Sequence, residues 1–381
     1  MYILAVDIGT GTQDILLHNT RLSVENGYKL VVPSPTMIIN RRVKQETSRR
    51  SSILLEGSIM GGGPSNWAVR GHLEQGLPVF ATPDAAKSFN DDLEVIRRSG
   101  ITLVSEDEAA SLPDSIVRIK LTDFDFDSIN QAFMQFGVSL NQLEAIALAV
   151  FDHGNAPAGY SDRQFRFDYI NNQITENGRL STFAFTSSEI PAAMTRMQAA
   201  ADAAGGLGIP VVVMDTAPAA VQGALLDEKI SGQRQKIIAN IGNFHTLAFK
   251  INEDAIQGVF EHHTGLVNTE KMDRLISKLA DGSLTHDEVF SDQGHGAWVK
   301  REKQKQLQDL DIHLTITGPR RNMMKTSHFQ PYFAAPFGDM MLTGCFGLLK
   351  AVADVMPDLH DEIIDSLSAL SPQNNAPWDV N

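Results

Sequence analysis

A glycine-rich turn near the start of the chain has the residue types for phosphate binding. It consists of Gly9, Thr10, Gly11 and Thr12, between the apolar runs 2–8 and 13–18. Because the two glycines have no Cβ atom, successive backbone N–H groups can approach phosphate oxygens, and the threonine hydroxyls add donors. We interpret the turn as a phosphate hairpin. A plain glycine-rich β-hairpin is the alternative for the turn taken alone.

Two acidic residues directly follow predicted buried strands. The continuous apolar runs 145–151 and 211–214 predict parallel strands. Sheets of this kind bind ligands outside the carboxyl ends of their strands. Asp152 and its neighbour His153 are therefore predicted to lie at the ligand. Asp215 is the second acidic candidate.

Histidines stand beside acidic residues in two segments, 261–263 and 292–295. Such groups are ligands of Zn, Fe and Mn, so a dedicated metal site is one interpretation. Adjacent residues of a regular strand face opposite sides, however, so His262 and His263 should not both point into one site. We favour contacts of His263 and His295 with substrate or phosphate. Solvated turn histidines are the remaining alternative.

The glycine-rich segment 61–64 predicts an anion-binding start of a helix. Pro64 suits the first turn of a helix that runs to about residue 75. The free N–H groups and the positive dipole end of such a helix favour a carboxylate or phosphate, so Gly62 and Gly63 are predicted substrate contacts. A flexible turn is equally compatible with these residues.

The elements that position these residues occur twice along the chain. Residues 2–8, 13–18 and 28–32 predict an antiparallel meander, and 237–246 with 255–261 repeats its order of strand, glycine-containing turn and strand. Further predicted elements are helices at about 64–75, 188–205, 269–280 and 339–355 and a strand at 312–317. Small residues at 217–224 and 343–347 would let two helices cross with their backbones close. The chain is therefore predicted to be a duplication.

Composition excludes several classes of function. Hydrophobic residues make up 43% and charged residues 20% of 381 residues, which is typical of globular proteins, and about 150 residues per domain suggests two lobes. The net charge of −14 opposes nucleic-acid binding. The start has no basic leader pattern, and the chain has no apolar run of the roughly 18 residues that span a membrane, so we expect a soluble, cytoplasmic protein. Cys345, the single cysteine, excludes an internal disulfide and cysteine-rich cluster sites.

The order of these motifs resembles the actin, hexokinase and heat-shock chaperone ATPase superfamily. Residues 7–14 and 240–246 match its two phosphate hairpins, and 315–321 matches its adenosine motif. The segments 214–220 and around Gly344 match its connectors. The resemblance implies an α/β, actin-like ATPase (ribonuclease H-like) fold with two duplicated lobes and a central cleft. The predicted boundaries are 1–227 for the first lobe, 235–338 for the second lobe, and 339–381 for a C-terminal connector helix and tail.

The same resemblance implies that the cleft binds ATP and Mg²⁺. Asp7 would hold Mg²⁺ through water. The resemblance also implies an acidic general base in this part of the first lobe, for which Asp152 is the candidate and His153 the alternative. The other implied nucleotide contacts are Gly242, Asn243, His245 and Thr246 in the second hairpin and Gly318 and Arg320 in the adenosine motif. The second hairpin departs from the superfamily pattern, because Asn240 replaces an expected aspartate and bulky side chains fill 243–245. A lobe that has lost ATP and kept the fold is therefore left open.

Three short segments, 60–64, 261–265 and 294–296, resemble more closely a prokaryotic family labelled as pyruvate formate-lyase activating enzyme. Radical activation of that kind uses an iron-sulfur cluster held by three closely spaced cysteines. Since this chain has one cysteine in total, we exclude that chemistry.

The leading functional hypothesis is an ATP- and Mg²⁺-dependent phosphotransferase or ATPase whose acceptor is unknown. The alternative from another class is a binding or regulatory protein with the actin-like fold and a degenerate nucleotide site. A metal-dependent hydrolase built on the histidine segments is a third hypothesis. Expected partners are a nucleotide and a small-molecule substrate, without nucleic acid or membrane. A protein partner or a homodimer is left open.

Overall fold

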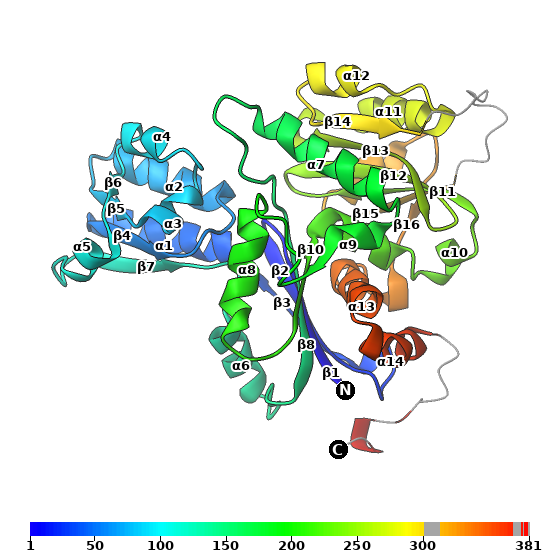
Figure 1. Cartoon of the computed structure of the whole chain (residues 1–381), viewed down its shortest axis with the longest axis horizontal. Coiled ribbons are helices and arrows are strands. Elements are labelled where there is room, and N and C mark those ends of the chain that lie inside the picture. Colours follow the sequence, from blue (N-terminus) through cyan, green and yellow to red (C-terminus); the bar gives the residue numbers. More distant parts are fainter. Residues whose placement is uncertain (301–312, 369–374, 376, 380–381) are drawn as a thin grey trace.

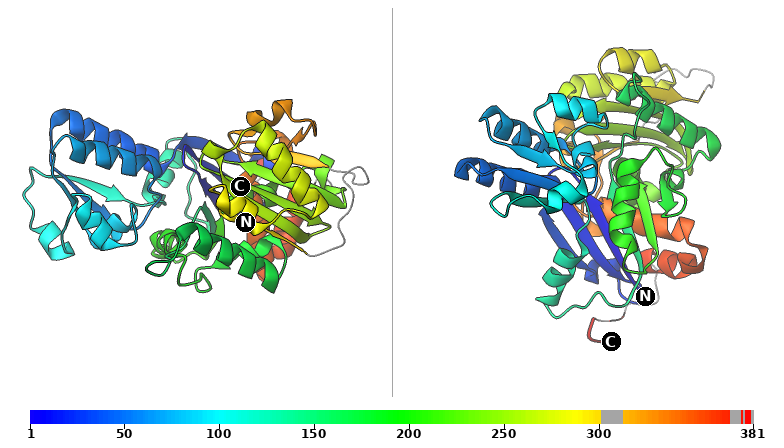
Figure 2. Two further views of the ribbon diagram at one scale, coloured as in Figure 1. Left: turned by 90° about the horizontal axis from the view of Figure 1, so that it is seen from above. Right: turned by 60° about the vertical axis from the view of Figure 1, so that its left-hand side comes forward.

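The described residues form three β-sheets. The computed structural model describes residues 1–300, 313–368, 375 and 377–379. Two of its sheets have six strands each and the third has four. Figure 1 shows the two large sheets with their helices in one body and the small sheet projecting to one side, and Figure 2 shows the same arrangement from two further directions. Among the described residues, no helix has the length and apolar character to cross a membrane.

The first large sheet contains the opening meander and has the order β3-β2-β1-β8-β10-β9. Its strands are β1 (Tyr2–Ile8), β2 (Thr12–Asn19), β3 (Tyr28–Pro33), β8 (Leu143–Val150), β9 (Ala184–Thr186) and β10 (Val211–Asp215). β1 to β3 are antiparallel, whereas β8 runs parallel to β1 and β10 runs parallel to β8. β8 and β10 are buried almost throughout, which explains their uninterrupted apolar sequences.

The second large sheet repeats this arrangement in the order β14-β13-β12-β11-β15-β16. Its strands are β11 (Gln235–Ile241), β12 (His245–Asn252), β13 (Ala255–His263), β14 (Gly296–Val299), β15 (Leu314–Thr317) and β16 (Tyr332–Phe333). β11 to β13 are antiparallel, and β15 and β16 add to β11 as parallel strands. The repeated strand order confirms the predicted duplication and the α/β, actin-like fold with two ribonuclease H-like lobes.

The small sheet belongs to a unit inserted between β3 and β8. Its four strands are parallel in the order β6-β5-β4-β7, with β4 (Ile53–Gly57), β5 (Val79–Ala81), β6 (Thr102–Leu103) and β7 (Val117–Leu121). Its helices are α1 (Pro35–Arg49), α2 (Gly63–Glu74), α3 (Pro83–Lys87), α4 (Leu93–Arg98) and α5 (Glu106–Ala110), and α6 (Phe126–Met134) leads back to β8. A separate apolar core between α1, α2 and this sheet stabilises the unit.

Two helices cross between the large sheets, α9 (Thr216–Ala224) and α13 (Thr343–Val355). α9 follows the first sheet but packs on β11 of the second, and α13 follows the second sheet but packs on β1 and β8 of the first. A Cβ atom on Gly223 would lie 1.7 Å from the carbonyl oxygen of Thr343, and one on Gly347 would lie 1.8 Å from that of Ala219. The predicted close crossing of small-residue helices is therefore confirmed.

The remaining helices test the sequence predictions. They are α7 (Asp162–Glu176), α8 (Thr195–Gly205), α10 (Glu228–Ser231), α11 (Thr269–Asp281), α12 (His286–Ser291) and α14 (Pro357–Leu367). The predicted helices at 64–75 and 269–280 are confirmed as α2 and α11. Cys345 is buried in α13.

Two predicted helix starts are wrong. The helix predicted from residue 188 begins only at Thr195. The Asp152 carboxylate accepts the backbone N–H groups of Arg196 and Met197, so these N–H groups have no partner in a preceding helical turn and the helix starts here. The final helix begins at Thr343 instead of 339, because the Asp339 carboxylate accepts the N–H of Met341 in a turn. In the strand predicted at 312–317, residue 312 lies outside the described residues.

The buried side chain of His18 gives a prediction about stability in acid. Its Nε2 lies 2.8 Å from the Ser366 hydroxyl, and burial, with the nearby N-terminal ammonium, lowers its pKa from 6.5 to about 4. The unfolded chain therefore takes up a proton as pH falls below 6.5, while the folded chain does not until about pH 4. The wild type should therefore lose up to about 3 kcal/mol of its free energy of unfolding between these pH values. Glutamine takes up no proton, so we expect His18→Gln to be spared this loss. Urea unfolding at pH 7 and pH 4.5 checks this, and equal losses in wild type and variant would contradict it.

Candidate functional site

A cleft of about 870 Å³ lies between the two large sheets and the inserted unit. It opens at the carboxyl ends of the parallel strands, where the first hairpin, the second hairpin and the start of α2 converge. The predicted site residues that line it are Asp7, Gly9, Thr10, Gly11, Thr12, Gly62, Gly63, Asp152, His153, Gly242, Asn243, His245 and Gly318. The predicted residues outside its lining are Asp215, Thr246, His263, His295 and Arg320.

The two hairpins meet tip to tip across this cleft. A Cβ atom on Gly11 would lie 3.2 Å from Nδ2 of Asn243. Both turns close in the same way, with Gly9 N–H donating to the Thr12 carbonyl at 3.0 Å and Gly242 N–H donating to the His245 carbonyl at 2.9 Å. Within the described chain, four backbone amides at the tips donate no hydrogen bond, those of Thr10, Gly11, Asn243 and Phe244. The cleft therefore offers unpaired donors from both lobes to an anion.

Two carboxylates lie beneath the first hairpin. Asp7 and Asp14 are direct partners in the β1–β2 register, and both line the cleft. Burial raises the pKa of Asp7 to about 6, although the Thr216 hydroxyl donates to its Oδ1 at 2.5 Å. Burial and the neighbouring Asp7 charge raise the pKa of Asp14 to about 8, and Oδ1 of Asp14 is buried without a hydrogen-bond partner. Such a pair favours a divalent cation, which offsets the like charges.

Asp14 was not predicted from the sequence. Its signal was its position opposite Asp7 in a four-residue hairpin, where cross-strand partners are neighbours. Gly344 approaches the same place from α13, because a Cβ atom there would lie 1.9 Å from Oδ2 of Asp7. The base of the first hairpin is thus closed by a helix from the far end of the chain.

The inserted unit reaches the second hairpin through aromatic contact. Trp67 of α2 packs edge-on against Phe244, with ring centroids 5.6 Å apart. A Cβ atom on Gly63 would lie 2.9 Å from the Phe244 ring, so this glycine allows the helix start to approach the hairpin tip. Phe244, which departs from the superfamily pattern, therefore joins the insertion to the second lobe.

Both predicted acidic bases, Asp152 and Asp215, already have hydrogen-bond or ion-pair partners within the protein. Oδ1 of Asp152 accepts the N–H of Gly154 at 2.8 Å, and Oδ2 accepts the N–H groups of Arg196 and Met197 at 2.9 Å each. Asp215 caps α9 and is fully buried in an ion pair with Arg166. His153 is exposed in the cleft and has no hydrogen bond within the described residues. Of the three, His153 is the side chain that has no hydrogen-bond partner among the described residues.

A buried charge network runs from Asp215 to the second hairpin. The Arg166 guanidinium pairs with Asp215 and, at 3.1 Å, with Glu261, whose other oxygen lies 2.9 Å from Nδ1 of His245. Burial alone would raise the pKa of Glu261, but Arg166 and the neighbouring histidines hold it well below its usual value. Arg166 was missed as a site residue, because sequence alone does not show that α7 packs against the second sheet. Glu261 lies in the segment 261–263, which was predicted only as a possible metal site.

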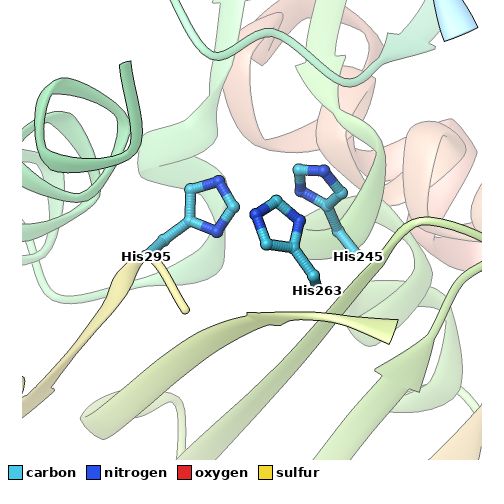
Figure 3. Close-up of side chains that lie close together, drawn as sticks. All are labelled: His245, His263 and His295. Atoms are coloured by element: carbon cyan, nitrogen blue, oxygen red, sulfur yellow. The ribbon is translucent and has the colours of Figure 1, made fainter. Parts of the chain in front are cut away.

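Three of the histidines come together at one end of the second sheet. His245 begins β12, His263 ends β13 directly opposite, and His295 precedes β14. Figure 3 shows their rings facing one another, and ring nitrogens of the three lie within 4.8 Å of one another. Burial, with the neighbouring histidines, lowers the pKa of His263 to about 4 and that of His295 to about 3. His262 packs away from this cluster toward Asp292, as the strand period predicts.

The predicted adenosine and second-hairpin contacts differ in position. Gly318 has a φ of +96° and lies against Asn240, whose Oδ1 would be 2.6 Å from a Cβ atom there. The Arg320 side chain is exposed and does not line the cleft, and the backbone N–H of Arg320 donates to the Ile241 carbonyl. Thr246 is buried, with its hydroxyl 2.9 Å from that of Thr264. The structure thus places Gly318 at the cleft and the side chains of Arg320 and Thr246 elsewhere.

Comparison with known proteins gives one family. Residues 60–323 match the model of the family described as "Putative pyruvate format-lyase activating enzyme (DUF1786)". No curated protein matches the chain. Similar solved structures include a ROK hexokinase from Thermus thermophilus, with 11% identity, coverage of 91% of this chain and 97% of that chain, and a TM-score of 0.30.

Two further solved structures cover most of the chain. The activator of the 2-hydroxyisocaproyl-CoA dehydratase from Clostridium difficile, with bound ADPNP, has 10% identity, coverage of 91% and 92%, and a TM-score of 0.33. The ethanolamine utilization protein EutJ from Carboxydothermus hydrogenoformans has 11% identity, coverage of 91% and 89%, and a TM-score of 0.31. At these scores, the strand order of the two large sheets remains the basis of the fold assignment.

Proposed function

We propose that this chain, which belongs to the DUF1786 family, is an ATP- and Mg²⁺-dependent phosphotransferase or ATPase, because two glycine-containing hairpins meet across its cleft. The unpaired amides at the two hairpin tips are the observation that carries this proposal. They are contributed by both lobes, as a polyphosphate lying between the lobes requires. The acceptor is a small molecule bound toward Gly62, Gly63 and His153.

The carboxylates beneath the first hairpin supply the place for Mg²⁺. Asp7 and Asp14 offer oxygen ligands, which Mg²⁺ prefers, and the orphaned Oδ1 of Asp14 is a free acceptor. ATP would supply a γ-phosphoryl group, whose transfer depends mainly on positioning and electrostatic stabilisation. Within the chain, the hairpin amides orient the phosphates and His153 accepts a proton from the attacking hydroxyl or water. Asp152 holds the loop that carries His153.

Isothermal titration with Mg-ATP tests the proposal. We expect the wild-type protein to bind Mg-ATP, and we expect Asp7→Ala and the isosteric Asp7→Asn to weaken binding by ~100-fold or more, about 2.8 kcal/mol. Asp127→Ala, at an exposed aspartate of α6 away from the cleft, is the matched control and should bind like the wild type. Absence of Mg-ATP binding by the folded wild type would overturn the proposal.

A regulatory or binding protein is the second candidate. Asn240 cannot supply a negative charge to a metal, and the Phe244 ring packs against Trp67 of the inserted unit. These features suit a second lobe that has a structural or binding role and takes no part in catalysis. Nucleotide binding without measurable ATP turnover, together with capture of a defined protein partner, would favour this candidate over an enzyme.

A further inference from the structure

The cluster of His245, His263 and His295 has the composition of a transition-metal site. Neutral imidazole is a strong ligand of Zn²⁺ and its neighbours in the first transition series, and three histidines with one open position are the ligand set of a catalytic zinc site. The ring centroids are 4.7 to 5.1 Å apart in all three pairs. A tetrahedral ion needs ligand nitrogens roughly 3.4 Å apart, so rings whose nitrogens lie within 4.8 Å close on it by small side-chain rotations.

A carboxylate supports one member of the cluster from outside. Glu261 is fully buried, and its Oε1 lies 2.9 Å from Nδ1 of His245. In metal sites, ligating histidines typically donate their other ring N–H to such a carboxylate, which fixes the ring and strengthens it as a ligand. Arg166 holds the second oxygen of Glu261, so the carboxylate is oriented by a further residue. Simple ring packing would not require this arrangement.

An unpartnered nitrogen gives a second, independent sign of a ligand. Nδ1 of His295 is buried and has no hydrogen-bond partner, and the residue is only 3% exposed. Its backbone N–H is paired with the Glu261 carbonyl at 2.9 Å, so the loop is fixed while the ring nitrogen is left unpaired. Buried polar atoms are normally paired, and a bound ion is one of the explanations for an exception.

We propose that His245, His263 and His295 bind one divalent transition-metal ion of the Zn²⁺ class, with an open fourth position toward the cleft. His245 lines the cleft beside Phe151, Asp152 and His153, so a ligand in the cleft reaches the ion from that side. The open position accepts an oxygen anion, either a phosphate or a carboxylate. This ion is separate from Mg²⁺ at Asp7, because imidazole nitrogens select a different metal from carboxylates.

The full-length protein, treated with a chelator and then titrated with Co²⁺, tests the site. Co²⁺ in a three-histidine site gives visible absorption bands of a tetrahedral centre, and we expect saturation at one equivalent. Zn²⁺ should displace the Co²⁺ and abolish the bands. We expect His263→Ala and His295→Ala each to weaken Co²⁺ binding by ~100-fold or more. His286→Ala removes a half-buried histidine outside the cluster and should leave the titration unchanged.

X-ray absorption at the Zn edge of the loaded wild type keeps the test independent of variant folding. We expect about three imidazole ligands in the first coordination shell. Failure of the wild type to bind one equivalent, or a coordination shell without histidine, overturns the proposal. A titration that His286→Ala alters as much as His263→Ala does also overturns it. Mg-ATP binding is measured separately, so either proposal can fail while the other stands.

Discussion

Replacing Arg166 with methionine is expected to destabilise the protein by about 3–5 kcal/mol. Arg166 is fully buried and pairs with two buried carboxylates, Asp215 and Glu261. Its guanidinium also donates to the Asp152 carbonyl at 2.9 Å and stacks 4.6 Å above the Phe151 ring. Methionine fills much of the volume but removes the positive charge that pairs with both buried carboxylates, and the cost of that loss dominates. Urea unfolding at pH 7 measures the loss.

Two comparison variants separate charge from packing. Arg166→Met combined with Asp215→Asn and Glu261→Gln removes the uncompensated charges, and asparagine at 215 still caps α9, so this triple variant should recover much of the lost stability. Arg234→Met breaks the exposed ion pair with Glu253 and should change stability by no more than about 1 kcal/mol. A loss below about 1 kcal/mol for Arg166→Met itself would show that the buried network contributes little.

Alanine at Gly223 or Gly347 is expected to destabilise the protein by about 3 kcal/mol or more. In each case the new methyl group would lie within 2 Å of a backbone carbonyl oxygen on the partner helix, so α9 and α13 must move apart. Backbone atoms cannot rotate away as a side chain does. The same separation would open the floor of the cleft, so weaker Mg-ATP binding should accompany the loss of stability.

The matched control is Gly71→Ala in α2. It makes the same substitution inside a helix, but its Cβ atom meets no atom within 4 Å. Because alanine has the higher helix propensity, this variant should be more stable by about 1 kcal/mol. Differential scanning calorimetry of the three variants distinguishes the effects. Equal behaviour of Gly71→Ala and Gly223→Ala would refute the close crossing.

The sequence predicted the parts of the fold that depend on local pattern. The two meanders and the two glycine turns could be predicted because the residues that define a strand and its turn lie within a few positions of one another. The four-stranded sheet of the inserted unit was missed, because strands as short as β6 and β5 carry too few residues to show a period. The start of α8 was misplaced since its cap comes from Asp152, far away in sequence.

In the candidate site, too, residues that are close in sequence were predicted and contacts between distant segments were not. The residues of each hairpin are local and were found, whereas the histidine cluster depends on the β12–β13 register and on β14 pairing beside β13. Sequence separated His262 from His263 by strand period but could not bring His245 next to His295, fifty positions away. Asp14 was passed over because cross-strand neighbours matter only once the hairpin register is known.

The exchange of helices between the two large sheets limits how the chain can be divided. α13 covers β1 and β8 of the first sheet, although it lies more than one hundred residues after them, and α9 covers β11 of the second. A fragment ending before β11 would expose the apolar face that α13 buries, at about 25 cal/mol for each Å². Although the strand order shows two related units, we expect neither half to fold alone, and gene fission between them should yield two fragments that must associate to become stable.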